Sequence, residues 1–169
     1  NYYFEALDGR PNTKGGQYRM NLLPTTVHVY FGRITGATPD GRKAKEPLND
    51  GISPVHGADK KGPTAVIKTA SKLDHVRTGG TLLNQKFLPS LLEGEGSLDR
   101  LASLIRTYFR LDGHHIQFNV VDSKTLRDAQ NNPEKYRDLI VRVAGYSDYF
   151  VDIGKELQEE IIARTEQKL

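Results

Sequence analysis

Gly145 is the residue whose type and position suggest the most distinctive chemistry in this chain. It follows an apolar run, Leu139–Ala144, and precedes the aromatic side chains of Tyr146, Tyr149 and Phe150. Glycine can lose an α-hydrogen to give a planar backbone radical, because it has no Cβ to be forced into the plane. The amide nitrogen donates electron density and the carbonyl withdraws it, so the unpaired electron is delocalised. A dry, closed surrounding would protect such a radical.

The ordinary alternative is that Gly145 is a turn glycine that ends a strand. The local physical chemistry by itself favours this interpretation. A radical role therefore needs support from other parts of the sequence.

Other residues that could do chemistry are better explained by structural roles. His28 is isolated, and His114 and His115 are adjacent, so on a strand they would point to opposite faces and would not chelate one metal. Residues Gly57–Thr64 look like a phosphate loop, but Pro63 stands where that motif requires lysine. We therefore predict no metal site and no nucleotide site, and expect Pro63 to begin a helix.

Composition excludes several classes of protein. Among 169 residues, 37% are hydrophobic and 27% are charged, as in ordinary globular proteins. The net charge of +3 comes from basic residues spread along the chain, so we expect no nucleic-acid partner. No apolar run reaches the length of about 20 residues that spans a membrane. The absence of cysteine excludes a disulfide or a thiolate within the chain and favours a cytoplasmic setting.

The domain organisation suggests part of something larger. The chain begins at Asn1 without methionine, and residues 1–62 are a loop-rich segment in which we expect one strand. Residues 63–169 form a segment of alternating strands and helices. A trimmed but complete domain is the alternative.

The periodicity of apolar residues predicts an alternation of strands and helices. In order, we expect a strand at Thr26–Phe31, a long loop at 36–62, a helix from Pro63, a strand at Thr81–Phe87 and a helix at Ser97–Leu111. There follow a strand at His115–Val121, a short helix through Gln130 that Ser123 or Asp122 caps, a strand at Leu139–Ala144 and a helix at Lys155–Gln167. This order predicts an α/β architecture with largely parallel strands. Both faces of Thr81–Phe87 mix apolar and polar residues, which is consistent with a strand whose inner face lines a polar cavity; a plain core strand is the alternative.

Sequence motifs support the radical hypothesis. Residues Arg142–Ser147 match each position of the loop R-V-A/S/C-G-Y/F-S of the glycyl radical enzymes, the family that includes pyruvate formate-lyase. Further stretches resemble the same family, in family order: Thr38–Lys43, Glu46–Leu48, Asp50–Pro54, Gly62–Ala65, His115–Asn119 and Gln158–Thr165. The resemblance covers about residues 20–169.

The resemblance implies a fold, a site and a set of partners. The fold would be the C-terminal part of a ten-stranded α/β barrel, ending in the glycyl radical loop and a terminal helix. Gly145 would carry the radical, with Arg142, Ala144, Tyr146 and Ser147 as the environment of the loop. No cofactor would be bound, because a separate radical S-adenosylmethionine activating enzyme with an iron–sulfur cluster would install the radical as a modification.

The resemblance also implies what this chain lacks. Family members carry a cysteine, followed two residues on by glutamate, whose thiyl radical attacks the substrate. That cysteine would belong to a missing N-terminal barrel portion, and the full-length enzyme would be an anaerobic homodimer. Its reaction would be radical dehydration, or C–N or C–C cleavage, of a small polar metabolite, and we expect the isolated chain to be inactive.

Two stretches, Gly79–Phe87 and Gly145–Phe150, look most like the dehydratase branch, and within it the trans-4-hydroxyproline dehydratase type. Glycerol dehydratase, propanediol dehydratase and choline lyase relatives stay open. Asp148 departs from the family pattern, where many members have alanine or glycine.

Two other functions stay open. The chain could be a stand-alone glycyl radical carrier that complements a damaged enzyme of the formate acetyltransferase type, or a binding domain without a radical. Resemblance far upstream of the glycine loop favours part of an enzyme.

Overall fold

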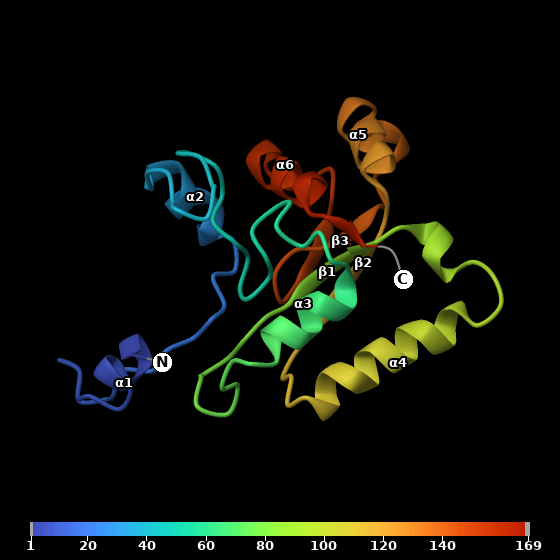
Figure 1. Cartoon of the computed structure of the whole chain (residues 1–169). Coiled ribbons are helices and arrows are strands. Elements are labelled where there is room, and N and C mark those ends of the chain that lie inside the picture. The colour runs from blue at the N-terminus through green and yellow to red at the C-terminus, as the bar shows by residue number, and fades with distance from the viewer. Residues whose placement is uncertain (1, 168–169) are drawn as a thin grey trace.

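The computed structural model describes residues 2–167, which form an α/β structure with two small sheets (Figure 1). Strands β1 (Asn84–Phe87), β2 (Gln117–Val120) and β5 (Glu166–Gln167) are parallel, in the order β2-β1-β5. The other sheet is an antiparallel hairpin of β3 (Ile140–Arg142) and β4 (Ser147–Tyr149). The expected α/β class and parallel pairing are confirmed, whereas the apolar strand before Gly145 pairs in a hairpin.

Successive residues of β1 and β2 point to opposite faces of the parallel sheet, and the two faces differ in composition. One face carries mainly apolar side chains, with the buried Gln85 among them, against helices α3 (Pro63–Ala70) and α4 (Ser97–Arg110). The other carries polar side chains against the hairpin, α5 (Ser123–Asn131) and α6 (Lys155–Ala163). In Figure 1 the pair α3 and α4 lies on one side of the strands, and the pair α5 and α6 lies on the other.

The core on the α3 and α4 side is apolar and was predicted well. Helix α4 follows the predicted spacing, with Leu104 and Tyr108 buried one turn apart. Pro63 begins α3 as expected. The cluster of buried residues consists of Val66, Ile67, Ala70, Leu83, Phe87, Leu104 and Tyr108.

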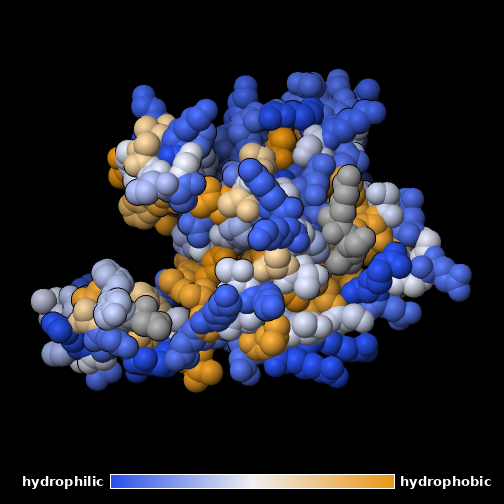
Figure 2. All heavy atoms as spheres, viewed as in Figure 1, coloured by the Kyte–Doolittle hydropathy of each residue, from blue (hydrophilic) through white to orange (hydrophobic). Residues whose placement is uncertain are grey.

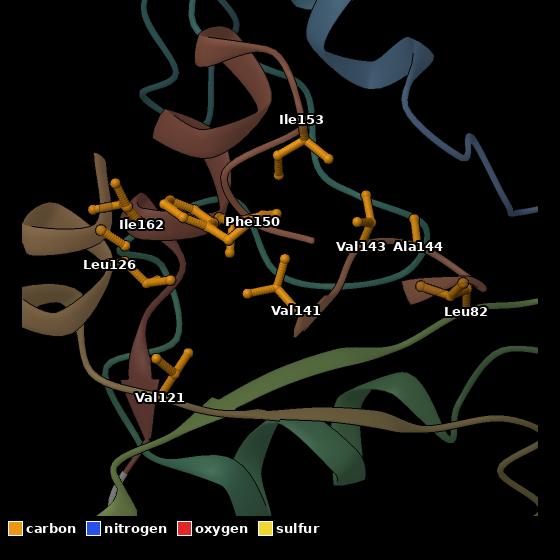
Figure 3. Close-up of a cluster of buried hydrophobic side chains, with 11 residues drawn as sticks. Leu82, Val121, Leu126, Val141, Val143, Ala144, Phe150, Ile153 and Ile162 are labelled. Carbon is orange, nitrogen blue, oxygen red and sulfur yellow. The ribbon is translucent and has the colours of Figure 1, made fainter. Parts of the chain in front are cut away.

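The core on the other side joins the hairpin to α5 and α6, and Figure 3 shows these side chains converging. Buried members from the hairpin region include Val141, Val143 and Phe150, each at most 1% exposed. Helix α5 is capped as predicted, because the Asp122 carboxylate accepts a hydrogen bond from the Thr125 amide at 2.6 Å. This core holds the hairpin against the sheet from one side.

Lys86 links the start of α5 and the end of α6 to β1. Its side chain is buried, and its Nζ donates to Ser123 Oγ at 3.0 Å and to the Ile162 carbonyl at 2.8 Å. A cation suits the carbonyls that end a helix. The C-terminus of α6 is thereby tied to the N-terminus of α5 and to β1.

The expected strand at Thr26–Phe31 is wrong, because Val27–Ile34 forms helix α2. The alternation of valine and aromatic residues suggested a strand. The buried positions, however, are His28 and Gly32, one helical turn apart, while Tyr30 is exposed. A buried face made of histidine and glycine is invisible to an apolar pattern. A further short helix, α1 (Tyr2–Leu7), precedes it.

The long loop between α2 and α3 is confirmed and is held by specific contacts. The buried Arg42 guanidinium donates to the carbonyls of Lys43 at 3.0 Å and Glu46 at 2.7 Å. Gly51 has φ +61°, and a Cβ there would lie 2.2 Å from the Leu82 carbonyl oxygen. Glycine therefore lets the loop run directly against the chain that enters β1.

The predicted C-terminal helix is four residues too long, since α6 ends at Ala163 and residues Glu166–Gln167 form β5. The helix stops because Arg164 leaves helical geometry, while Thr165 and Gln167 bond to the Asp59 carboxylate of the long loop. Two 3-10 turns, η1 (Pro89–Leu92) and η2 (Pro133–Lys135), complete the structure. Over residues 2–167, no helix combines the length and apolar character needed to span a membrane.

Candidate active site

Gly145 lies at the tip of the β3–β4 hairpin. The hairpin pairs Arg142 with Ser147, and the connection is closed by a hydrogen bond from the Val143 amide to the Tyr146 carbonyl at 2.9 Å. Its φ of +83° is in the left-handed region that favours glycine. The structure thus gives a conformational reason for glycine at this position.

The surroundings of Gly145 are less closed than a protected radical requires. Residues Val143 and Ala144 are buried, but Gly145 itself is exposed. A Cβ built on it would meet Leu82 Cδ1 at 3.4 Å and Leu23 Cδ1 at 4.0 Å, which are ordinary contacts. The dry enclosure expected from the neighbouring aromatic residues is not provided by residues 2–167.

Three carboxamide side chains from the sheet hold the backbone of the glycine loop. Asn119 is paired with Arg142 in both directions: its Oδ1 accepts from the Arg142 amide and its Nδ2 donates to the Arg142 carbonyl, each at 2.7 Å. Asn84 Nδ2 donates to the Val143 carbonyl at 3.2 Å. Gln117 Oε1 accepts from the Gly145 amide at 3.2 Å. Side-chain amides therefore replace the main-chain ladder that would join two strands.

The structure brings these amides, which belong to two expected strands, onto one face of the sheet. Asn84 and Gln117 are paired in the parallel register, and Asn119 follows two residues later on the same face. Their alternation with apolar residues was the signal, together with the expectation of a polar inner face. Their partners could not be read from sequence, because the hairpin lies far away along the chain.

The other residues predicted for the loop environment surround Gly145 in different ways. Arg142 donates from Nε to Gln117 Oε1 at 2.8 Å and from Nη1 to Ser147 Oγ at 3.2 Å. Ala144 is buried, and Tyr146 packs partly against the core. Burial raises the pKa of the Tyr146 phenol, and the charge of Asp148 adds to this effect. Arg142 and Ser147 thus join the two strands of the hairpin beside the glycine.

A buried cluster of charged side chains, formed by Arg164, Glu160 and Asp50, contacts the backbone of the same hairpin through Arg164. Arg164 donates from Nη2 to Glu160 at 2.7 Å and from Nη1 to the Arg142 carbonyl at 3.3 Å, and it lies 4.0 Å from Asp50. His28 and His56 contact the same Glu160 oxygen at 3.5 and 3.2 Å. The charged groups are therefore paired, as buried charges must be.

The pKa values of this cluster follow from burial and pairing. Burial by itself would raise the pKa of Glu160, but the contacts with His28 and His56 and the Arg164 guanidinium hold it well below its usual range. Burial raises the pKa of Asp50, against the opposing charge of Arg164. Glu160 is thus the carboxylate that stays ionised. It holds Arg164 in place to donate to the Arg142 carbonyl of the hairpin.

His28, His114 and His115, for which the sequence predicts structural roles, lie among protein side chains. His28 is part of the Glu160 cluster, and His114 Nδ1 lies 3.5 Å from Thr81 Oγ1. Burial lowers the pKa of His115, and the nearby charge of Arg142 acts in the same direction. No group of three or more histidine and carboxylate side chains is placed to hold a metal ion among the residues that the structure describes.

A large cavity lies away from Gly145. It has a volume of about 800 Å³ and lies between α2, the long loop and α6. Arg33 and Arg42 line it together with Glu156 and Glu159, so neither sign of charge dominates. Because no hairpin residue lines this cavity, we do not assign it to the glycine site.

The arrangement around Gly145 supports one kind of chemistry. Within residues 2–167, a Cβ built on Gly145 would meet only the Cδ1 atoms of Leu82 and Leu23, and the Gly145 amide is held by a defined acceptor. An exposed α-carbon in a fixed peptide plane can lose a hydrogen atom to an external radical. The geometry is therefore suited to forming a radical at the backbone, whereas its protection requires a cover that residues 2–167 do not provide.

Comparison with known proteins gives consistent matches. A family model described as "Glycine radical" matches residues 48–151. Trans-4-hydroxy-L-proline dehydratase from Clostridioides difficile is 58% identical over 99% of this chain. The crystal structure of hydroxyproline dehydratase from the same organism, with trans-4-hydroxy-L-proline bound, gives a TM-score of 0.93 at 57% identity over 99% of this chain.

The B12-independent glycerol dehydratase from Clostridium butyricum, in its glycerol-bound form, gives a TM-score of 0.93 at 54% identity over 99% of this chain. In all three comparisons this chain covers 21% of the other protein. The chain therefore spans about a fifth of the length of the relatives that it matches.

Proposed function

This chain belongs to the glycyl radical enzyme family, with the fold of the C-terminal part of its α/β barrel, and on that basis we propose that it stores a radical on Gly145. The observation that carries the proposal is the position of Gly145 inside the matched region, at the tip of a hairpin that the sheet holds by its backbone. A turn glycine would need no such set of amide contacts.

The proposed chemistry begins with homolysis of one C–H bond at the Gly145 α-carbon. The hydrogen atom passes to a carbon radical that an activating enzyme generates from S-adenosylmethionine by one-electron reduction. One electron stays on the α-carbon, delocalised over the adjacent amide and carbonyl. In use, Gly145 takes a hydrogen atom from a cysteine thiol, which becomes the thiyl radical that attacks the substrate.

That cysteine must come from outside this chain, which contains none. We propose that a barrel portion carries it, that the isolated chain is inactive, and that the full-length protein is a cytoplasmic homodimer. The proposed reaction is dehydration, or C–N or C–C cleavage, of a small polar metabolite. A 4-hydroxyproline-like substrate is our first proposal, supported by 58% identity to trans-4-hydroxy-L-proline dehydratase. The 54% identity to glycerol dehydratase keeps a polyol as the alternative.

Exposed apolar side chains, one beside Gly145 and others on α2, support an enclosing partner surface. Leu23 is 42% exposed beside the glycine, and on α2 Tyr30, Phe31 and Ile34 are 52%, 47% and 64% exposed. Figure 2 shows hydrophobic residues bordering the hollow at the left of the view, between the parts that Figure 1 labels α1 and α2. Exposed apolar surface of this kind is typical of interaction sites. We propose that the barrel portion covers it and supplies the dry enclosure that Gly145 lacks.

Oxygen sensitivity tests the position of the radical. The chain is combined with the barrel portion and activated without oxygen, and activation is verified by release of methionine from S-adenosylmethionine. Brief exposure to air should then cleave the backbone at Gly145 and release a C-terminal peptide identified by its mass. A chain that stays intact after verified activation would contradict the proposal.

Two alanine variants provide the matched control. Gly145→Ala should abolish cleavage while the chain still folds, because a Cβ meets ordinary contacts there and the left-handed backbone costs about 1–2 kcal/mol. Gly154→Ala introduces the same methyl group into open space and should leave cleavage unchanged. Cleavage that persists in Gly145→Ala would place the radical elsewhere.

A further inference from the structure

The Gln117 side chain is the direct partner of the Gly145 amide. Gln117 is 6% exposed and lies on β2. Its Oε1 accepts two hydrogen bonds, from Gly145 N at 3.2 Å and from Arg142 Nε at 2.8 Å. One oxygen thus joins the glycine amide to a cation that belongs to the same hairpin.

Chemistry fixes the orientation of this carboxamide. Gly145 N–H and Arg142 Nε–H are donors only, so the oxygen of Gln117 must face them. The Gln117 amide group then donates to Asn84 Oδ1, and Asn84 in turn donates to the Val143 carbonyl and to the Asp50 carboxyl group. A flip of either amide would set donor against donor or acceptor against acceptor, so the network permits one arrangement.

An acceptor on the N–H of Gly145 matters for a radical at its α-carbon. The radical is stabilised when the amide nitrogen donates electron density toward the α-carbon. A hydrogen bond from that N–H to an oxygen increases the donating capacity of the nitrogen. It also holds the peptide plane in one orientation, which delocalisation requires. Successive hydrogen bonds polarise one another in the same direction, so the chain through Asn84 strengthens Gln117 Oε1 as an acceptor.

We propose that Gln117 is the positioning residue of the radical, which orients the Gly145 amide and tunes how far the unpaired electron spreads onto it. The proposal rests on the proposed radical at Gly145. Gln117 touches the amide of the reacting residue and not its α-hydrogen. Gln117 also binds Arg142 of the hairpin, but its contact with the Gly145 amide distinguishes it from a residue that only anchors the hairpin.

Asn119 offers a matched control for that distinction. It lies two residues along the same strand face and makes two hydrogen bonds to the Arg142 backbone, but none to Gly145. Replacing Asn119 by leucine weakens the docking of the hairpin and leaves the acceptor at Gly145 in place. Replacing Gln117 by leucine removes that acceptor at similar volume.

Amide hydrogen exchange tests the contact in the chain without any radical. In Gln117→Leu, exchange at Gly145 should accelerate severalfold relative to Val143, whose amide is bonded within the hairpin. Gln117→Glu keeps an oxygen facing Gly145 and Arg142 but loses the donor to Asn84, so exchange at Gly145 should be slower than in Gln117→Leu. An unchanged ratio of the two exchange rates in a folded Gln117→Leu chain would overturn the proposal.

Electron paramagnetic resonance of the activated protein, in complex with the barrel portion, tests the electronic role. Gln117→Leu should widen the doublet of the single α-hydrogen, because more spin density stays on the α-carbon, and should shorten the lifetime of the radical severalfold. Gln117→Glu, which keeps the oxygen at Gly145 but not the donor to Asn84, should restore both values in part. Asn119→Leu should lower the yield without changing the splitting. An unchanged splitting and lifetime in Gln117→Leu would overturn the role of Gln117 and leave the radical intact. No doublet in the unmodified protein would overturn the proposed function itself.

Discussion

The two faces of the β1–β2 pair are built from alternate residues of the same strands, yet they are held by different forces. Toward α3 and α4, Leu83 and Phe87 are fully buried in an apolar cluster, where shape and volume decide the packing. Toward the hairpin, Asn84, Gln117 and Asn119 act through hydrogen bonds with defined donors and acceptors. The apolar face supports the sheet, whereas the polar face positions a particular backbone.

The largest effect should come from breaking the charge cluster that supports the polar face. Glu160→Ala leaves the Arg164 guanidinium buried without its main partner, which should lower the free energy of unfolding by about 3–5 kcal/mol. Because Arg164 also donates to Arg142, exchange at Gly145 should accelerate as well. Urea denaturation and amide exchange measure the two effects. A loss below about 1 kcal/mol would mean that the buried ion pair does not anchor the hairpin.

A cavity on the apolar face should destabilise the fold without disturbing the site. Leu83→Ala should cost about 2–5 kcal/mol, because the residue is fully buried among α3 and α4 side chains. The rate of exchange at Gly145, relative to Val143, should stay as in the unmodified chain. If Leu83→Ala disturbs that ratio as much as Glu160→Ala does, the two faces are not independent.

A smaller, gradual effect should appear at alkaline pH through Lys86, on the polar face. Burial, mainly, lowers the pKa of Lys86 from 10.5 to about 8. Between these values the unfolded chain binds a proton that the folded chain has released, so this group makes stability rise with pH, by at most about 1.4 kcal/mol per pH unit. Lys86→Met should lack this contribution when denaturation midpoints are compared across that range. If stability changes with pH at the same slope in Lys86→Met and in the unmodified chain, Lys86 does not make this contribution.

Sequence patterns predicted the apolar face better than the polar one. The spacing of Leu104 and Tyr108 and the proline at position 63 were enough to place α4 and α3, because apolar periodicity and helix-start chemistry are local signals. Helix α2 was missed because its buried residues are His28 and Gly32. His28 is buried against Glu160, which lies far along the chain, and such a contact produces no local pattern in the sequence.

The same distinction applies to the site. Gly145 could be found from its motif, and the structure places it at a hairpin tip with the predicted Arg142 and Ser147 beside it. The roles of Gln117 and Asn119 depend on a register between distant strands, which sequence does not give. The expected parallel strand before Gly145 is a hairpin strand, because the chain reverses at the glycine that the motif identifies.

The radical at Gly145 is the central claim, and isotope-edited electron paramagnetic resonance tests it most directly. The chain, combined with the barrel portion and activated without oxygen, should give a doublet from one α-hydrogen. Protein grown with α-deuterated glycine should give a single narrow line, since deuterium couples more weakly, and Gly145→Ala should give no signal. A doublet that persists in Gly145→Ala, or that survives deuteration, would contradict the account.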